Sequence, residues 1–278
     1  MLGDAMVIGL AAALTAAMLF GSGSILQTIA SRNVPLAVGL SHRIVLALVR
    51  QPVFVAAIGL NLLGFSFHLL ALRTIPLFLA QSGIAASLAV TALLAMRFLN
   101  DPLGPPDWAA VAAVCCGLAT LAASAGDVGE NGQGNGFVVV VFAALAVVGL
   151  SGLVASRFHG AAAAAALGLL AGFGFAGVSV SARLLPDLHP STVVHSLATY
   201  SLALSGCLAF LLYSLALQRG SVTGATGPMI VTQTVTPSAV GVLALHDAIR
   251  AGWQIPAIVS FAITAAGAAA LARFEQAP

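Results

Sequence analysis

The sequence predicts an all-α membrane protein with about nine transmembrane helices, or ten, arranged as two inverted-topology repeats. Mean hydropathy is +1.08 and only 6% of the 278 residues are charged, which leaves too little polar surface to keep a globule of this size in water. Apolar stretches of about 20 residues, each able to cross a hydrocarbon core about 30 Å thick, recur along the chain. They lack the alternation typical of membrane-barrel strands, so we expect helices.

Nine apolar stretches are long enough to span the membrane. They cover approximately residues 5–30, 52–72, 75–98, 107–124, 137–156, 161–183, 191–217, 221–244 and 253–272. The first follows Met1–Asp4 without a basic segment and is too long for a signal peptide, so we expect it to remain as a helix. A tenth candidate, Leu36–Val49, is only about 14 residues long and carries His42 and Arg43, so it is either a short tenth helix or an interfacial one.

The ten basic residues are all arginines, and their positions predict the topology. With nine spans, Arg73, Arg183 and Arg250 fall on one side of the membrane. The other side then carries Arg32, Arg43, Arg50, Arg97, Arg157, Arg219 and Arg273. A tenth span would divide the remaining nine arginines five to four, so nine spans fit the positive-inside rule better. We therefore expect a multi-pass protein of the cytoplasmic (inner) membrane with an external N-terminus and a cytoplasmic C-terminus.

An internal repeat is the second signal. Shifting the chain by 145 positions places Trp108 on Trp253, the only two tryptophans, and Val90-Thr91 on Val235-Thr236. A looser match places Gly21 and Arg32 on Gly172 and Arg183. Matched helices are five spans apart, an odd number, so the two copies cross the membrane in opposite directions. We expect residues 1–124 to form one half, 161–278 the other, and 125–160 an external, flexible Gly-rich linker followed by a connecting helix.

Four segments carry a family resemblance: Leu48–Phe65, Ala71–Leu77, Gln81–Ile84 and Trp253–Leu271. They look like the drug/metabolite transporter superfamily, and their spacing is most similar to the branch of EamA-type permeases and NIPA-like magnesium transporters. That superfamily commonly has ten helices. The weak segment Leu36–Val49 departs from this pattern, so the chain resembles the nine-helix NIPA-like layout instead. The resemblance implies a secondary carrier of small molecules such as amino acids, sugars, drugs or divalent cations.

Polar side chains on the third and eighth helices are the main candidates for a solute site, because polar groups near the midplane are costly. Pro228 and Pro237 free backbone carbonyls in the eighth helix and predict a discontinuous, substrate-lining helix. The 145-residue shift also superposes His68 on Tyr213. The candidate cavity lining is Gln27, His68, Gln81, Ser87, Thr91, Tyr213, Thr226, Thr232, Gln233 and Thr236. The alternative is that such Ser and Thr residues bond their own backbone or join helices.

Other features of the sequence restrict the function. No carboxylate is expected inside a span, which disfavours proton antiport and a dedicated magnesium site and favours a neutral or zwitterionic solute or a lipid-linked head group. Cys115, Cys116 and Cys207 are expected to be small buried hydrophobes, and the glycines of the sixth helix to serve close packing. We expect no enzyme, cofactor, metal site or nucleic-acid partner.

A secondary transporter of a small metabolite is therefore the predicted function, with the lipid bilayer and a small-molecule substrate as partners and a homodimer left open. The alternatives are a non-transporting membrane subunit of a cell-envelope complex and a magnesium facilitator.

Overall fold

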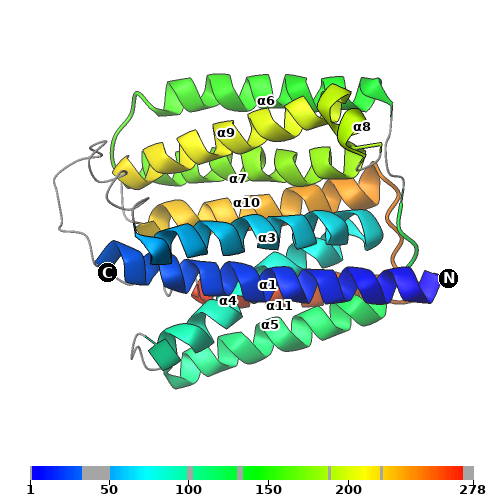
Figure 1. Ribbon diagram of the computed structural model, residues 1–278, viewed down its shortest axis with the longest axis horizontal. Helices are drawn as coiled ribbons and strands as arrows, with labels where there is room; N and C mark the ends of the chain where they lie inside the picture. Colours follow the sequence, from blue (N-terminus) through cyan, green and yellow to red (C-terminus); the bar gives the residue numbers. More distant parts are fainter. Residues whose placement is uncertain are drawn as a thin grey trace.

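The protein is a bundle of long helices that lie side by side along the longest axis of the molecule (Figure 1). The computed structural model describes residues 2–32, 51–98, 103–129, 134–186, 189–219 and 222–271. The helices within these ranges are α1 (Leu2–Arg32), α3 (Pro52–Thr74), α4 (Leu77–Phe98), α5 (Pro105–Ser124), α6 (Asn135–Ala155), α7 (Ala161–Leu184), α8 (Pro190–His195), α9 (Leu197–Arg219), α10 (Val222–Leu243) and α11 (Gln254–Leu271).

Seven helices are long and apolar enough to cross a membrane: α1, α3, α4, α5, α6, α7 and α9. The prediction of an all-helical, multi-pass membrane protein is thus confirmed for the described residues. Helices also occur at the other two predicted positions, but α11 is apolar over the 17 residues Gln254–Ala270 only, and α10 contains two prolines and several threonines. The candidate tenth segment, Leu36–Val49, lies outside the described residues.

The seventh predicted helix, expected over residues 191–217, is interrupted at Ser196. This residue is extended (φ −78°, ψ 131°) and separates the short α8 from α9. Its hydroxyl oxygen accepts a hydrogen bond from the Ala198 backbone N–H (3.2 Å). A serine hydroxyl that bonds a nearby backbone N–H offers the chain an alternative to a continuous helix, and serine is favoured at the residue before a helix begins. The chain therefore starts a new helix at Leu197 instead of continuing α8.

The helices pack in two similar groups. In one group α1 packs against α3 and α4, and in the other α7 packs against α9 and α10, with α5 against α11 and α6 beside α7 and α9. The expected role of the α7 glycines in close packing is confirmed. A Cβ atom on Gly172 would lie 2.6 Å from the Met229 carbonyl oxygen of α10, and one on Gly177 would lie 2.7 Å from the Ser205 hydroxyl of α9. Small residues thus let α7 approach both neighbours closely.

Helix α10 is continuous from Val222 to Leu243 although Pro228 and Pro237 lie inside it. The expectation of a discontinuous helix is wrong. Hydroxyl groups of α10 bond back to its own carbonyls: Thr232 donates to the Pro228 carbonyl (2.8 Å) and Ser238 to the Thr234 carbonyl (2.7 Å). Neither bond replaces one that a proline removes, because the carbonyls that lose their donor are those of Gly224 and Gln233, four residues before each proline.

The first part of the Gly-rich linker bonds to the loop between α10 and α11. Ala125 pairs with Ile249 in an antiparallel bridge; Gly126 donates its N–H to the Ala248 carbonyl, and the Ala248 N–H donates to the Asp127 carbonyl, both at 3.0 Å. The loop between α10 and α11 therefore satisfies backbone groups of Gly126 and Asp127, while the expected flexibility of the loop over residues 127–136 stays a prediction. Residues 130–133 lie outside the described part.

The cysteines lie within helices, as predicted, but their side chains are not buried. The Cys115, Cys116 and Cys207 side chains are all free and exposed. The expectation that they are buried is wrong. Cys115 and Cys116 lie on the surface of α5, which in a membrane bundle faces hydrocarbon and suits a small apolar thiol, whereas Cys207 lines a cavity between the helices.

Candidate functional site

A cavity of about 610 Å³ lies between the two groups of helices. Asn61 and Phe65 line it from the middle of α3, and Gln233 lines it from the middle of α10. The complete lining is Phe20 and Ser24 of α1, Asn61, Phe65 and His68 of α3, Gln81, Ile84 and Ser87 of α4, Phe175, Val178 and Ser179 of α7, Leu202, Ala203, Gly206 and Cys207 of α9, and Gln233 of α10. Both groups of helices therefore build one chamber.

Two polar side chains of the cavity are buried without a complete set of hydrogen-bond partners. Gln81 is 1% exposed and His68 is 4% exposed, and the Nε2 atom of each has no hydrogen-bond partner among the described residues. A buried polar atom left unpaired costs about 1–3 kcal/mol. The Gln81 Nε2 atom carries two N–H donors, so this amide offers hydrogen bonds that the protein itself does not use.

The rest of the wall is largely apolar and aromatic. Phe20, Phe65 and Phe175 project from three different helices, and the Phe20 ring meets the His68 ring edge-on, with ring centroids 6.4 Å apart. This contact is the arrangement that aromatic rings prefer. A few polar groups on an otherwise apolar concave surface are typical of small-molecule sites.

The structure brings together four of the residues predicted from the sequence: His68, Gln81, Ser87 and Gln233. On α4, Gln81, Ile84 and Ser87 recur at intervals of three residues and so share one face of the helix. The hydroxyl of Ser87 also donates to the Ile84 carbonyl (2.6 Å). Two polar side chains of α4, Gln81 and Ser87, therefore line the cavity from one face of the helix.

Other predicted residues lie elsewhere. Thr91 and Thr232 donate to carbonyls four residues earlier, at 2.9 Å and 2.8 Å, which is the alternative that the sequence left open. Thr236 lines a separate hollow of about 170 Å³ beside α6 and α7, and Tyr213 packs against a buried hydrophobic cluster. Gln27 belongs to α1 and Thr226 to α10, but the description does not extend to their side chains.

Among the polar residues of α10 whose side chains are described, only Gln233 lines the cavity, and the rotation of the helix explains why. A Cβ atom on Gly172 would lie 2.7 Å from the Thr232 Cβ atom, so Thr232 faces α7. Gln233 is the next residue and points about 100° away around the helix. Its backbone carbonyl also lacks the usual donor four residues later, because Pro237 has no N–H.

Several lining residues are not among those predicted from the sequence, including Ser24, Asn61, Ser179 and Cys207. Of these residues, Asn61 could have been predicted most easily from the sequence, because an amide in the middle of an apolar span is costly and often has a functional role. The aromatic residues carried no such signal, since phenylalanine is common in any membrane helix.

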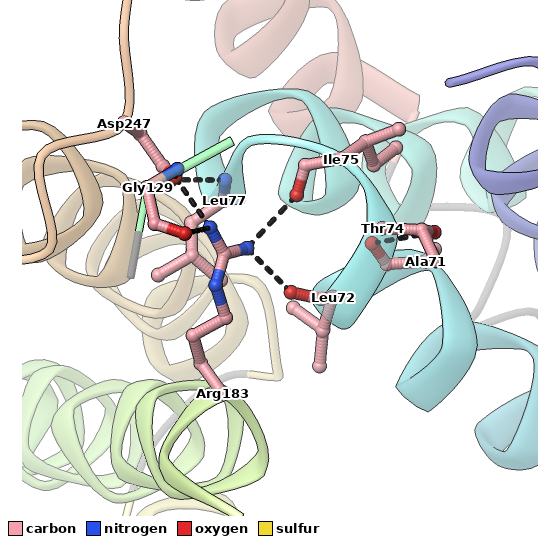
Figure 2. A network of polar contacts seen from close by, with 8 residues as sticks. All are labelled: Ala71, Leu72, Thr74, Ile75, Leu77, Gly129, Arg183 and Asp247. Carbon is pink, nitrogen blue, oxygen red and sulfur yellow. Dashed lines mark hydrogen bonds and ion pairs between the residues drawn. The ribbon is translucent and has the colours of Figure 1, made fainter. Parts of the chain in front are cut away.

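A second polar cluster lies at one end of the bundle and is centred on Arg183 (Figure 2). The Arg183 and Asp247 side chains are completely buried, with Nη2 of the arginine 2.5 Å from Oδ1 of the aspartate. Nη1 of Arg183 donates to the carbonyls of Leu72 (2.6 Å) and Ile75 (3.0 Å), where α3 ends. The guanidinium therefore joins the end of α7 to the corner between α3 and α4.

Asp247 extends this cluster to two more segments. Its Oδ2 atom accepts the backbone N–H of Leu77 at the start of α4 (2.6 Å), and its Oδ1 atom accepts that of Gly129 after α5 (2.8 Å). Arg183, Asp247, Leu72, Ile75, Leu77 and Gly129 are called the end cluster below. The carboxylate thus stabilises an arginine and two backbone N–H groups with charge-assisted hydrogen bonds.

Arg183 counts toward the predicted membrane sidedness, but its side chain is fully buried and paired with Asp247. The sequence contains a sign that Arg183 is buried, because the apolar run continues after it through Leu184 and Leu185 before Pro186. Nearby, Arg73 donates to the carbonyls of Leu185 and Pro186. Two of the arginines on the predicted external side therefore serve to hold the protein together.

Comparison of the chain with family models, with curated proteins and with solved structures gives no match. The resemblance drawn from the sequence therefore stays a prediction, and the functional argument rests on the cavity and the end cluster.

Proposed function

We propose that this protein is a secondary transporter, a permease or exporter, which moves a small metabolite across the cytoplasmic membrane by alternating access. The observation that carries this proposal is the cavity of about 610 Å³, which helices of both groups line near their middle and which contains buried, unpaired polar atoms. Transporters of this kind bind their solute near the bilayer midplane, between two repeats that move against each other.

Equivalent contacts in the two groups support an internal repeat. A Cβ atom on Gly21 of α1 would lie 2.9 Å from the Ser87 carbonyl oxygen of α4, and one on Gly172 of α7 would lie 2.7 Å from the Thr232 Cβ of α10. The sequence superposes Gly21 on Gly172 and Ser87 on Thr232. The same helix crossing thus occurs in both groups, between the first and third helix of each.

The directions of the helices support inversion of the second copy. In the first group, a Cβ atom on Gly64 would meet Phe20 and one on Gly9 would meet Thr74, so α1 and α3 are antiparallel. Arg183 bonds Leu72, so α3 and α7 end at the same face. It follows that α1 and α7, the first helix of each group, run in opposite directions. This arrangement is the one expected for an inverted repeat of four helices, with α6 as the connector between the two copies. In this interpretation α10 and α11 also cross the membrane, which gives nine crossings.

The end cluster is well placed to close one face of the cavity in the alternating-access cycle. It joins segments from both groups, since Leu72, Ile75 and Leu77 belong to the first and Arg183 and Asp247 to the second. We assign this face to the external side. Arg73 and Arg183 are engaged by protein groups there, so the excess of other arginines at the opposite face is consistent with a cytoplasmic location.

This architecture fits the drug/metabolite transporter superfamily, and within it the EamA-type and NIPA-like branch to which the sequence shows a resemblance. Membership of that superfamily is part of the proposal.

The proposal is tested by the accessibility of Cys207, which lines the cavity and is exposed. Replacing Cys115 and Cys116 by serine leaves Cys207 as the single thiol, because the chain has three cysteines. In oriented membrane vesicles, a membrane-impermeant maleimide should label Cys207 from one aqueous side. The matched control is Cys207→Ser, in which Cys115 and Cys116 of α5 remain and should react only with a lipid-soluble maleimide. If Cys207 also reacts only with the lipid-soluble reagent, the cavity is not aqueous and a non-transporting membrane subunit becomes the better interpretation.

A further inference from the structure

We propose that the solute bound in this cavity is a neutral, partly aromatic molecule that presents a hydrogen-bond acceptor, a carbonyl or hydroxyl oxygen, to the Gln81 amide. This inference rests on the proposed transport function and names the substrate class of the same site. It narrows the expectation from the sequence, which also admitted zwitterionic solutes and lipid-linked head groups.

The charge of the solute follows from the wall. The lining residues contain no aspartate, glutamate or arginine within the described part of the chain. His68 is the one lining residue there that can titrate near neutral pH, and it is 4% exposed. An ionised group that enters such a cavity would lose its hydration without gaining a partner of opposite charge, which is strongly unfavourable. A neutral solute has no such penalty.

The aromatic character follows from the shape and the composition of the wall. Phe20, Phe65 and Phe175 line the cavity from α1, α3 and α7, so an aromatic ring in the cavity can make offset or edge contacts with more than one of them. The volume of about 610 Å³ lies within the usual range of about 300–1,000 Å³ for small-molecule sites.

The acceptor follows from the unpaired atoms. Gln81 lines the cavity and is 1% exposed, and its Nε2 atom is unpaired among the described residues, so the protein supplies no oxygen for its N–H groups. A solute oxygen would satisfy this donor, whereas a solute without an acceptor would leave it unpaired. The His68 Nε2 atom, which is also buried and unpaired, lines the same cavity and provides a second polar contact.

Three ring-matched probes test the charge: indole-3-acetamide is neutral, indole-3-acetate is an anion and tryptamine is a cation at pH 7. The measurement is the rate at which the impermeant maleimide labels Cys207 in the single-cysteine protein. We expect indole-3-acetamide to slow labelling at concentrations about tenfold lower than either charged analogue requires, which corresponds to the loss of one well-placed interaction. Equal or better protection by a charged analogue would overturn the substrate class.

A fourth probe, 3-ethylindole, tests the acceptor without any change to the protein. It keeps the ring but has no oxygen, so it should protect Cys207 about tenfold more weakly than the amide does. Gln81→Met, which removes the donor and nearly preserves the length of the side chain, should abolish the advantage of the amide. The control is Ser82→Ala, because Ser82 is buried beside Gln81 but bonds the Phe78 carbonyl (2.8 Å). Retained preference in Gln81→Met, or equal protection by 3-ethylindole, would overturn the assignment of this donor.

These outcomes separate the two proposals. If Cys207 is labelled from water but no neutral aromatic probe protects it, the substrate class is wrong and the proposed transport function stands. If Cys207 is not labelled from water at all, the proposed function is wrong and the substrate class is overturned with it.

Discussion

Arg183 of α7 and Asp247 of the loop between α10 and α11 form an ion pair in which both side chains are completely buried. Both partners also bond backbone groups where α3 ends and α4 begins. An ion pair removed from water contributes to a structure only when its remaining donors and acceptors are satisfied. Here two backbone N–H groups satisfy the aspartate, and two helix-end carbonyls accept bonds from Nη1 of the arginine, whereas its Nε atom has no hydrogen-bond partner among the described residues.

Removing the charge of Asp247 should strongly destabilise the protein. Asp247→Asn preserves the shape of the side chain but leaves the Arg183 guanidinium buried without a counter-charge, a change that typically costs about 3–5 kcal/mol. The free energy of unfolding is measured by titration with a denaturing detergent in mixed micelles. Asp127→Asn is the control, because only the backbone carbonyl of Asp127 is seen to bond the same loop. Equal stability of the two variants would contradict a structural role for the pair.

The same substitution should also change access to the cavity. If the end cluster closes the external face, Asp247→Asn should raise the rate of Cys207 labelling from that side and lower it from the other, because the equilibrium between the two open states shifts. The measurement uses the single-cysteine protein in vesicles of known orientation. An unchanged ratio of the two labelling rates would show that the cluster stabilises the fold without acting as a gate.

Close packing between α7 and α10 should make Gly172 intolerant of a side chain. Gly172→Ala places a methyl group 2.6 Å from the Met229 carbonyl oxygen, and overpacking of this kind costs about 1–3 kcal/mol. Gly59→Ala in α3 is the matched control, because a Cβ atom there would meet nothing within 4 Å and should stabilise the helix by about 0.5–1 kcal/mol. The same detergent titration compares them, and similar effects at both sites would refute the packing argument.

Neighbouring residues of α10 should differ in their effect on solute binding. Gln233 lines the cavity, whereas the Thr232 hydroxyl bonds the Pro228 carbonyl. Gln233→Leu should therefore raise the concentration of indole-3-acetamide that is needed to protect Cys207 by about tenfold, which is the effect of one lost hydrogen bond. Thr232→Val should leave that concentration unchanged. The opposite result would show that α10 is rotated relative to the arrangement described here.

Helix positions could be predicted from the sequence because they depend on local properties. Length, hydropathy and the low content of charged residues placed a helix at each of the nine positions where the structure has one. The main local error was at Ser196, where a single hydroxyl competes with the helical backbone and divides the expected helix into α8 and α9. Such competition depends on one side chain and leaves the hydropathy of the segment unchanged.

The candidate site was predictable only in part. Gln81 and Gln233 are amides in apolar helices, and the cost of an amide in a membrane makes both of them candidates from the sequence alone. Thr91, Thr232 and Thr236 are candidates for the same reason, but a threonine hydroxyl can form its hydrogen bond with a backbone carbonyl of its own helix. Whether it does so or faces a cavity depends on the rotation of the helix, which neighbouring helices set.

The sequence by itself determined that this is an all-helical membrane protein, because hydrocarbon admits few other solutions for a chain so poor in charge. Only the tertiary structure decided which helices share a cavity and that Arg183 is a buried partner of Asp247, 64 residues away in the chain. The physical reason is that burial in lipid acts on each segment separately, whereas a cavity and an ion pair arise from the packing of segments that are distant in sequence.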